Sequence, residues 1–398
     1  MSDTNSLSVD MVILAAGLSE RMGVFKPLLP VGGVPTVIRC MDIGRAAGVR
    51  DIIIVSGYCA DALAGAVTAY ASGAEARTSP GAVTAYASGA SVQTIRLVHN
   101  SRYSEGMYSS VRAGVSALRP GSDSFFLLPS DCCAQAPDSL KSLIRIFGEN
   151  SCEYIVRPAY QGKRGHPPLI PAKFIKPLLE YSGEHGLKGF LNPLPTITAE
   201  MEDPGLLLDM DTPDDYSALL EHIGMPGYPD RAQCEQLLAK FNVSEEITRH
   251  GEQVAVLALS LARSLYIKGV PLSLPLLESA CLLHDIARSS PDHAREGMNL
   301  LLKEGYPKTA ILVGSHMDLQ SEPDETDDIS ERELLYLSDK LCRRGRILSP
   351  GEREKELESI YPAGSEAHAK AMSRMAAART ILSILGAKYG ILDLPDLA

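Results

Sequence analysis

The feature that most constrains this chain is the spacing of its short apolar runs. Between residue 11 and about residue 220, runs rich in Val, Ile and Leu alternate with helix-like stretches: MVILAA (11–16), DIIIVSG (51–57), TIRLVHN (94–100), SFFLLPSD (124–131), EYIVRP (153–158) and GLLLDMD (205–211). Continuous apolar runs of this length are typical of strands that are buried on both faces. Strands that alternate with helices usually form a parallel sheet. We therefore predict an α/β domain with a mostly parallel sheet.

The pattern changes after Tyr216, where the strand-like runs stop. The segment IGMPGYPDR (223–231) carries two prolines and two glycines, which favour a linker. From residue 232 to residue 398 the apolar residues recur with helical spacing, which predicts an all-α region. We expect a first domain over 1–222, a linker over 223–231 and a helical domain over 232–398, which is a reasonable division for 398 residues.

Charge and cysteine usage narrow the class of protein. The formal net charge is −11 and the basic residues are spread along the chain, which argues against a nucleic acid or an anionic membrane as partner. No apolar run reaches the roughly 20 residues of a membrane span, and the polar start MSDTNSLSVD does not resemble a signal peptide. The eight cysteines form no CxxC pair, so we expect reduced thiols and a cytoplasmic location.

A duplication interrupts the first domain. The decapeptide GAVTAYASGA occurs at 65–74 and again, unchanged, at 81–90, a period of 16 residues. Two copies indicate a local tandem duplication rather than a repeat architecture, which needs at least three. The residues are small, so we expect the extra copy to lengthen a surface helix or loop at little entropic cost.

The first apolar run leads into a segment suited to phosphate. Small residues at the carboxyl end of a parallel strand let backbone N–H groups approach phosphate oxygens, and basic side chains add charge. The residues in question are Ala15, Ala16, Gly17, Ser19, Arg21, Gly23 and Lys26. The spacing matches neither GxxxxGK[ST] nor GxGxxG, so it alone leaves an ordinary strand-to-helix turn equally open.

Carboxylates end two other runs. Asp131 follows SFFLLPS, so it should face the same crevice, where it can hold Mg²⁺ or cap a turn. In DMDTPDDY, we interpret Asp211 as the N-cap of a helix and Asp209 as a second Mg²⁺ ligand, with capping or simple solvation of Asp209 as the alternative.

These segments together resemble the nucleotidyltransferases that act on the molybdenum cofactor. LAAGLSERMGVFKPLLPVGG (14–33) is similar to the signature of that family, VHNSRYSEGMYSSVRAG (98–114) to its segment around the acceptor, KRGHPPLI (163–170) to its Gly-His-Pro turn, and DMDTPDDY (209–216) to its closing motif. The resemblance implies a Rossmann-like fold that binds a nucleoside triphosphate, and the Ala15-Ala16-Gly17 form resembles the branch that uses CTP. Cys132-Cys133 replaces the usual pair after the metal aspartate.

The resemblance also implies roles and partners. Lys26 would steady the phosphates together with Arg21, Asp131 would hold Mg²⁺, and Asn100, Gly106, Ser109 and His166 would line the substrate pocket. The reaction would be in-line attack of an acceptor phosphate on the α-phosphorus of CTP or another NTP, with release of pyrophosphate. A phosphorylated pterin is the implied acceptor, with a molybdoenzyme as possible client. A sugar phosphate or phosphocholine is the alternative.

The second half contains potential metal ligands on the apolar faces of its predicted helices. A buried Asp must be paired or bound to metal, and independent core defects at so many positions are improbable, whereas one metal centre in a helical bundle explains all of them. These ligands are His250, His284, Asp285, His293, His316 and Asp339. A set of N and O donors without thiolate suits Mn, Fe, Co, Ni or Zn.

The order of these residues resembles the HD superfamily of metal-dependent phosphohydrolases, over roughly 240–345. RHGEQVA (249–255), LLHDIA (282–287) and LSDKL (337–341) match its motifs. The resemblance implies one metal on His250, His284, Asp285 and Asp339, with His293 and His316 for a second. Arg288, Arg343, Arg344 and Arg346 could clamp substrate phosphate or be solvated. The alternative function is a regulatory metal-binding module. Beyond residue 350 we expect helices without chemistry.

Overall fold

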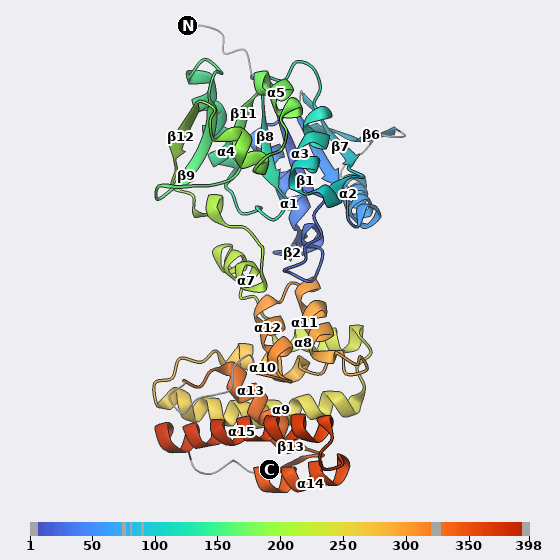
Figure 1. Ribbon diagram of the computed structural model, residues 1–398, viewed down its shortest axis with the longest axis vertical. Helices are drawn as coiled ribbons and strands as arrows, with labels where there is room; N and C mark the ends of the chain where they lie inside the picture. The colour runs from blue at the N-terminus through green and yellow to red at the C-terminus, as the bar shows by residue number, and fades with distance from the viewer. Residues whose placement is uncertain (1–6, 74–76, 80–81, 89–90, 320–327, 392–398) are drawn as a thin grey trace. The chain divides into compact units, whose positions relative to one another are not determined.

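A computed structural model describes residues 7–73, 77–79, 82–88, 91–319 and 328–391. The chain divides into two compact units between Met225 and Pro226. The predicted linker 223–231 therefore spans the boundary, and each unit is described by itself (Figure 1). Among the described residues, no helix is long and apolar enough to cross a membrane. The cytoplasmic location stays a prediction.

The N-terminal unit is built on one twisted sheet. Its central strands run parallel in the order β8 (Ser124–Pro129), β1 (Val9–Ala15), β4 (Asp51–Ser56) and β7 (Ser91–His99). On one side, β11 (Leu169–Pro171) pairs antiparallel with β8, followed by β9 (Ile155–Tyr160) and β10 (Lys163–Arg164), each antiparallel to the strand before it. On the other side, β6 (Ala82–Ser88) pairs antiparallel with β7, and β5 (Arg77–Ser79) pairs antiparallel with β6. β12 (Thr196–Glu200) pairs with β9 in parallel. The prediction of an α/β fold with a mostly parallel central sheet is confirmed.

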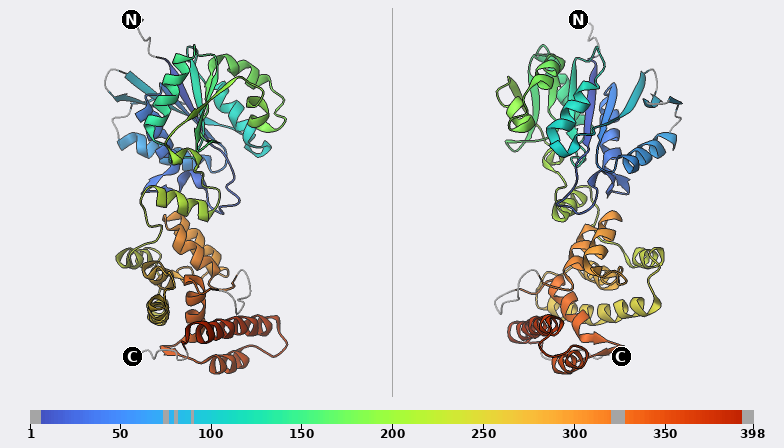
Figure 2. Two further views of the ribbon diagram at one scale, coloured as in Figure 1. Left: turned by 90° about the vertical axis from the view of Figure 1, so that its left-hand side faces the viewer. Right: turned by 45° about the vertical axis from the view of Figure 1, so that its right-hand side comes forward.

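Helices cover both faces of this sheet (Figure 2). Successive residues of a strand face opposite sides of the sheet, and on each side of β1 a helix packs against the strand through a glycine. Gly44 of α1 (Thr36–Ala47) packs on Met11, and Gly114 of α3 (Met107–Ser116) packs on Val12, so close that an added Cβ would lie 2.8 and 2.4 Å from those side chains. The remaining elements of the unit are α2 (Ala60–Gly73), α4 (Pro137–Glu149), α5 (Ile175–Glu180), α6 (Gly186–Leu191), α7 (Pro213–His222), the 3₁₀ turns at Lys26–Leu28, Tyr103–Glu105, Ala172–Phe174 and Pro204–Leu207, and the short hairpin of β2 (Pro30–Val31) and β3 (Val34–Pro35).

One predicted strand is wrong. GLLLDMD (205–211) forms the end of a 3₁₀ turn, Pro204–Leu207, and then a loop. The reason is local: Asp203 accepts a hydrogen bond from Gly205 N at 3.0 Å, and Pro204 follows at the first helical position, which starts a helical turn. The neighbour of β9 is instead β12, whose sequence TITAE has little apolar signal.

The duplicated decapeptide adopts two different structures. Residues 65–73 belong to helix α2, whereas residues 82–88 form the strand β6, which pairs antiparallel with β7 and with β5. The expectation that the extra copy lengthens a helix or loop is therefore wrong for its described residues, which add strand to one side of the sheet. Residues 74, 81, 89 and 90 of the two copies lie outside the described residues.

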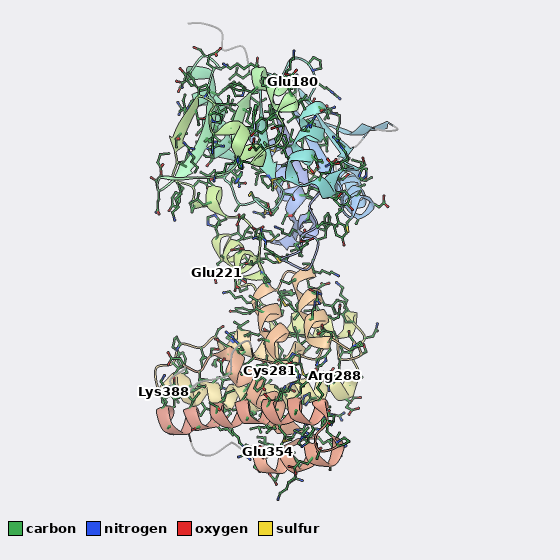
Figure 3. The ribbon with its side chains drawn as sticks, viewed as in Figure 1. Glu180, Glu221, Cys281, Arg288, Glu354 and Lys388 are labelled. Carbon is green, nitrogen blue, oxygen red and sulfur yellow. The ribbon has the colours of Figure 1, made fainter. Side chains whose placement is uncertain are left out.

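The C-terminal unit is helical, as predicted, except for one small hairpin. Its helices are α8 (Arg231–Lys240), α9 (Glu245–Ile267), α10 (Leu274–Leu283), α11 (His293–Lys303), α12 (Pro307–Ser315), α13 (Glu331–Leu341), α14 (Pro350–Ile360) and α15 (Glu366–Tyr389). The hairpin joins β13 (Cys342–Arg343) to β14 (Arg346–Ile347). Figure 3 shows Cys281, at the centre of this unit, on α10, which packs against α9, α12 and α13.

All eight cysteines lie in the described part of the chain, and none is in a disulfide. Cys132 and Cys133, which depart from the family pattern, are buried, and Cys40 donates to the Cys132 carbonyl at 3.5 Å. Burial raises the pKa of Cys133 to about 12. These thiols therefore form part of the core beneath the end of β8.

Candidate active sites

The loop after β1 has the shape expected of a phosphate-binding segment. Ser19 and Gly23 adopt left-handed backbone conformations (φ 58° and 74°), and the Ser19 hydroxyl accepts a hydrogen bond from Lys26 N at 3.1 Å. A Cβ placed on Gly17 would meet nothing within 4 Å, so the surrounding fold does not itself require glycine there. The open space beside Gly17 is available to a ligand that approaches the backbone.

Lys26 connects three separate parts of the sequence. Its ammonium group lies 2.7 Å from an oxygen of Asp131, after β8, and 2.7 Å from an oxygen of Asp211, before α7. Arg21 reaches the other oxygen of Asp211 at 2.7 Å, with 72% of its side chain exposed. Burial opposes the charge on Lys26, but the two carboxylates outweigh this and raise its pKa; the hydrogen bond from Lys26 in turn lowers the pKa of Asp211. The carboxyl end of the sheet thus holds a compact, charged cluster.

The N-cap of the helix after DMD is not the residue that we expected. Thr212, not Asp211, is the N-cap of α7, in a capping box with Asp215. Asp211 is therefore free to pair with Lys26 and Arg21, a role that the sequence analysis missed. Asp209 follows a loop rather than a strand, and partial removal from water, together with the charges of Asp211 and Asp131, raises its pKa.

A pocket of about 850 Å³ lies in the same unit, and Gly106 and His166 are among its lining residues. Their role in binding substrate stays a prediction. Burial lowers the pKa of His166, while the charge of Asp131 acts in the opposite direction, so His166 lies within electrostatic reach of the Lys26 cluster. Cations that the sequence analysis missed also line this pocket: Arg157, Arg164 and Lys188. A charged residue within the apolar run EYIVRP was the signal that could have identified Arg157.

Asn100 and Ser109 do not line this pocket. The Asn100 amide donates to the Ser109 and Ser110 hydroxyls at 2.8 and 3.0 Å, and its oxygen accepts from Arg102 N at 3.0 Å. These bonds fix the turn that leads into α3. Asn100 and Ser109 therefore hold the backbone around Gly106, which lines the pocket, in place.

The six predicted ligands of the C-terminal unit come together. Their donor atoms form two groups, each within 4.8 Å: one of His250, His284 and Asp339, the other of Asp285, His293 and His316. Ions bound by N and O atoms at about 2.0–2.2 Å have ligand atoms no more than about 4.4 Å apart, so both groups are close to this size. Asp285 also lies 3.6 Å from His284 Nε2, which places it between the groups. The predicted partition differs, because Asp285 groups with His293 and His316.

The orientation of two buried imidazoles fits a metal. His284 Nδ1 donates to the Cys281 carbonyl at 2.8 Å, and His316 Nδ1 donates to the Val313 carbonyl at 2.6 Å. Each ring therefore presents a bare Nε2, and both atoms are buried without a hydrogen-bond partner. A backbone carbonyl on one ring nitrogen and a cation on the other is the usual arrangement of metal-binding histidines. These donors fit divalent transition metals.

The charges around these ligands act on the two rings in opposite directions. Burial opposes the charge on His284, but the neighbouring carboxylates of Asp339 and Asp285 outweigh this and raise its pKa. Burial lowers the pKa of His316 to about 3, so the ring is neutral and its Nε2 lone pair is available. Burial alone would raise the pKa of Asp339, but Lys340, His250 and His284 lower it well below its usual range. Cys342 also lines the pocket, but it belongs to neither group of donor atoms; burial raises the pKa of its thiol to about 12.

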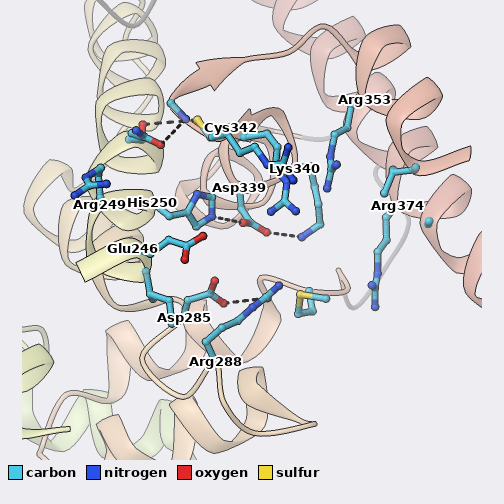
Figure 4. Close-up of a pocket in the computed structure, with 18 of the residues that line it drawn as sticks. Glu246, Arg249, His250, Asp285, Arg288, Asp339, Lys340, Cys342, Arg353 and Arg374 are labelled. Carbon is cyan, nitrogen blue, oxygen red and sulfur yellow. Dashed lines mark hydrogen bonds and ion pairs between the residues drawn. The ribbon is translucent and has the colours of Figure 1, made fainter. Parts of the chain in front are cut away.

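A pocket of about 960 Å³ opens over these ligands (Figure 4). His250, Asp285 and Asp339 lie at its floor, and Arg288 lies beside Asp285 at 3.4 Å. Basic side chains outnumber acidic ones in the lining: Arg249, Arg288, Lys340, Arg343, Arg344, Arg353 and Arg374 against Glu246, Asp285 and Asp339. Arg346, predicted as a possible clamp, is not among the lining residues. Residues beyond 350 reach this pocket, since Arg353 and Arg374 are among its lining residues. The expectation that this region carries no chemistry stays a prediction.

Comparison with known proteins gives a family match in each unit. The model of the MobA-like NTP transferase domain matches residues 11–198, and that of the HD domain matches residues 247–344. A molybdenum cofactor cytidylyltransferase of Escherichia coli K12 is 25% identical over 209 residues, which are 52% of this chain and 94% of the relative.

Solved structures that match this chain cover about half of it. Rv0371c of Mycobacterium tuberculosis is 24% identical (TM-score 0.41; 54% of this chain and 98% of that chain), and its complex with manganese is 23% identical (0.39; 54% and 98%). A nucleotidyl transferase of Methanothermobacter thermautotroptrophicus is 20% identical (0.42; 54% and 97%). The family assignments confirm both predicted resemblances: this chain joins a MobA-like NTP transferase domain to an HD domain.

Proposed function

We propose that the N-terminal unit transfers a cytidylyl group from CTP to the phosphate of the molybdenum cofactor and releases pyrophosphate. The observation that carries the proposal is the Lys26 cluster, which gathers a lysine, an arginine and two carboxylates at the carboxyl edge of the sheet beside an open glycine loop. Ligands of α/β sheets bind at this edge. The relative named as a molybdenum cofactor cytidylyltransferase supports this choice of acceptor and nucleotide.

Each residue has a part in this chemistry. The backbone of Gly17 and Ser19 would approach the triphosphate, and Lys26 and Arg21 would neutralise the charge that develops as pyrophosphate leaves. Asp131, with Asp211 or Asp209, would hold Mg²⁺, whose remaining ligands would be phosphate oxygens; the ion would neutralise phosphate charge. Arg157, Arg164 and Lys188 would bind the acceptor phosphate in the neighbouring pocket, which His166 shapes as a neutral ring. The expected molybdoenzyme client stays a prediction.

The test is pyrophosphate release from each of the four NTPs with molybdenum cofactor, a sugar phosphate or phosphocholine as acceptor. CTP with molybdenum cofactor should give the highest kcat/KM. A clear preference for GTP would contradict the nucleotide assignment, and turnover with only one of the other acceptors would contradict the pterin. Asp138→Asn, at an exposed aspartate on α4 that pairs with the neighbouring Lys141, is a matched control for Asp131→Asn.

We propose that the C-terminal unit is a metal-dependent phosphohydrolase. The observation that carries this proposal is the pair of bare, buried Nε2 atoms of His284 and His316 beneath a cationic pocket. Bound divalent metals would supply an activated water and polarise a phosphoryl oxygen. The residues of this chain would hold the metals through the two ligand groups, with Asp285 between them. Arg288 would bind the substrate phosphate. This arrangement favours catalysis over a purely regulatory role.

The test of the hydrolase combines metal analysis with phosphoester hydrolysis by the full chain in Mn²⁺, Fe²⁺, Co²⁺, Ni²⁺ or Zn²⁺. Asp285→Asn keeps the volume but removes a charge that offsets the cations, so metal content and hydrolysis should both fall. Glu304→Gln, in a surface ion pair with Lys240 of the same unit, is the control and should change neither. Metal that binds normally without hydrolysis of any phosphoester would favour the regulatory alternative.

A further inference from the structure

The outer part of the cationic pocket comes from outside the matched HD domain. The match ends at residue 344, yet α14 and α15 contribute Arg353, Leu357, Tyr361, Ala371, Arg374 and Met375 to the lining. Figure 4 shows Arg353 and Arg374 on the side of the pocket away from His250 and Asp285. The wall opposite the metal ligands is therefore formed by residues outside the family match.

Two arginines of this wall are held in place from behind. Arg374 makes two hydrogen bonds to Asp318, at 2.7 and 2.8 Å, and Arg353 makes one to Glu356 at 2.6 Å. Neither acid lines the pocket. The Arg374 side chain is 27% exposed and that of Arg353 is 16% exposed, so both guanidinium groups have few alternative positions. Fixed guanidinium groups lose little entropy when they bind an anion.

The wall is also fixed relative to the metal ligands. The Tyr336 hydroxyl of α13 donates to the Arg374 carbonyl of α15 at 3.1 Å, and α13 carries the ligand Asp339. The hairpin after α13 turns at Arg344 and Gly345, both with positive φ (48° and 80°), as a two-residue hairpin turn requires. Gly345 N donates to Gln253 Oε1 of α9 at 3.2 Å, three residues from the ligand His250. Within the described ranges Arg344 has no acidic partner.

The pocket has more basic side chains than one phosphate group at the metals needs. Lys340 and Arg288 already contact Asp339 and Asp285, beside the ligands, and would serve the reacting phosphate. Arg353 and Arg374 lie on the opposite side of the pocket (Figure 4), and Arg344 and the apolar side chains Leu357 and Met375 also line it. A volume of about 960 Å³ is that of a pocket for an organic ligand rather than for a single phosphate ion.

We propose that the wall formed by α14, α15 and the β13–β14 hairpin binds a second anionic group of the substrate, on the part that leaves. The proposal rests on the hydrolase proposed above. The substrate is then an organic phosphoester whose leaving group carries its own phosphate or comparable anion. In the reaction the water oxygen bonds to phosphorus, the ester P–O bond breaks, and a proton from the water ends on the released alcohol. Arg353 and Arg374 determine specificity and take no part in bond breaking.

The test compares adenosine 3′,5′-bisphosphate with adenosine 5′-monophosphate, which differ by one phosphate. The full chain, loaded with Mn²⁺, should hydrolyse the bisphosphate with at least tenfold higher kcat/KM. Arg374→Gln and Arg353→Gln should each lower that value about 10- to 100-fold while they change the value for the monophosphate less than threefold. Arg379→Gln is the control: it lies on the same helix and makes a similar two-bond contact, with Glu354, but does not line the pocket.

Calorimetric binding of the same bisphosphate separates this proposal from the hydrolase itself. Arg374→Gln should weaken binding about tenfold or more, and Arg379→Gln should leave it unchanged, whether or not either probe is hydrolysed. Equal preference for the two probes, or equal losses on both in Arg374→Gln, would overturn the second-anion site and leave the hydrolase intact. Normal binding without hydrolysis in any metal would overturn the hydrolase and leave the site. Pyrophosphate as the preferred substrate would contradict an organic leaving group.

Discussion

Replacement of Lys26 by Met should produce two separable defects. Met keeps most of the length and the apolar part of the side chain but removes the charge and both 2.7 Å contacts. Loss of one preorganised charge from a phosphoryl-transfer site costs about 3 kcal/mol, which is a factor of roughly 150 in rate. We therefore expect pyrophosphate release from CTP to fall by about two orders of magnitude in kcat/KM.

The second defect concerns stability. The Lys26 side chain is only 13% exposed, and without it Asp131 loses its ammonium partner, while Asp211 keeps its contact with the exposed Arg21. Loss of a charged partner in such a partly buried site costs about 1–3 kcal/mol of unfolding free energy. For a unit of this size that lowers the melting temperature by roughly 2–4 °C for each kcal/mol. Because Mg²⁺ can replace the ammonium group between the carboxylates, millimolar Mg²⁺ should restore part of the loss in Lys26→Met and have less effect on the wild type.

Calorimetric melting with and without Mg²⁺, together with a pyrophosphate assay, measures both effects. Lys141→Met is the matched control, since Lys141 is an exposed lysine on α4 that pairs only with the neighbouring Asp138. Turnover within threefold of wild type would refute the role of Lys26 in the reaction. A melting temperature that falls but does not respond to Mg²⁺ would refute a shared cation position at Asp131 and Asp211.

Further predictions concern the remaining features. Asp211→Asn should lower transferase activity at least tenfold more than Asp209→Asn, because only Asp211 contacts Lys26; the reverse order in the pyrophosphate assay would restore the sequence-based assignment. Deletion of residues 65–80 leaves the same sequence as deletion of residues 75–90. Helix α2 should therefore persist, and only β5 and β6 should be lost. A melting temperature lowered by more than about 5 °C would show that these two strands stabilise the sheet. Removal of metal by a chelator should lower the melting temperature of the C-terminal unit, because a ligand bound only to the native state stabilises it. An unchanged melting curve would contradict the metal centre.

The sequence indicated which side chains belong to the two candidate sites better than it indicated which residues they contact. The six ligands of the C-terminal unit lie on apolar helical faces, and a buried polar side chain on such a face needs a reason, which made them visible without a structure. Lys26 and Asp131 were identified by a different signal, because they belong to the segments that follow apolar strands. Asp211 was missed because Thr212 and Asp211 are both good capping residues, and only the tertiary contact with Lys26 distinguishes them.

Other features could not be read locally at all. One decapeptide is helix at 65–73 and strand at 82–88, so its own side chains cannot determine its structure; the pairing with β7 does. Arg353 looks like a surface arginine in the sequence, since Glu352, Glu354 and Glu356 surround it, and Arg374 lies in a helical stretch without any metal-ligand pattern. Their role depends on the packing of α14 and α15 over the metal ligands, which no spacing rule encodes.

The most direct test of this account is the number of metal ions bound per chain by the purified, full-length protein. Two ligand groups, with Asp285 between them, predict close to two divalent ions per wild-type chain after saturation and dialysis, as measured by elemental analysis. His316→Ala should retain about one, because His250, His284 and Asp339 are untouched. A wild-type chain that binds no metal, or a His316→Ala chain that still binds two, would contradict the centre on which the proposed hydrolase rests.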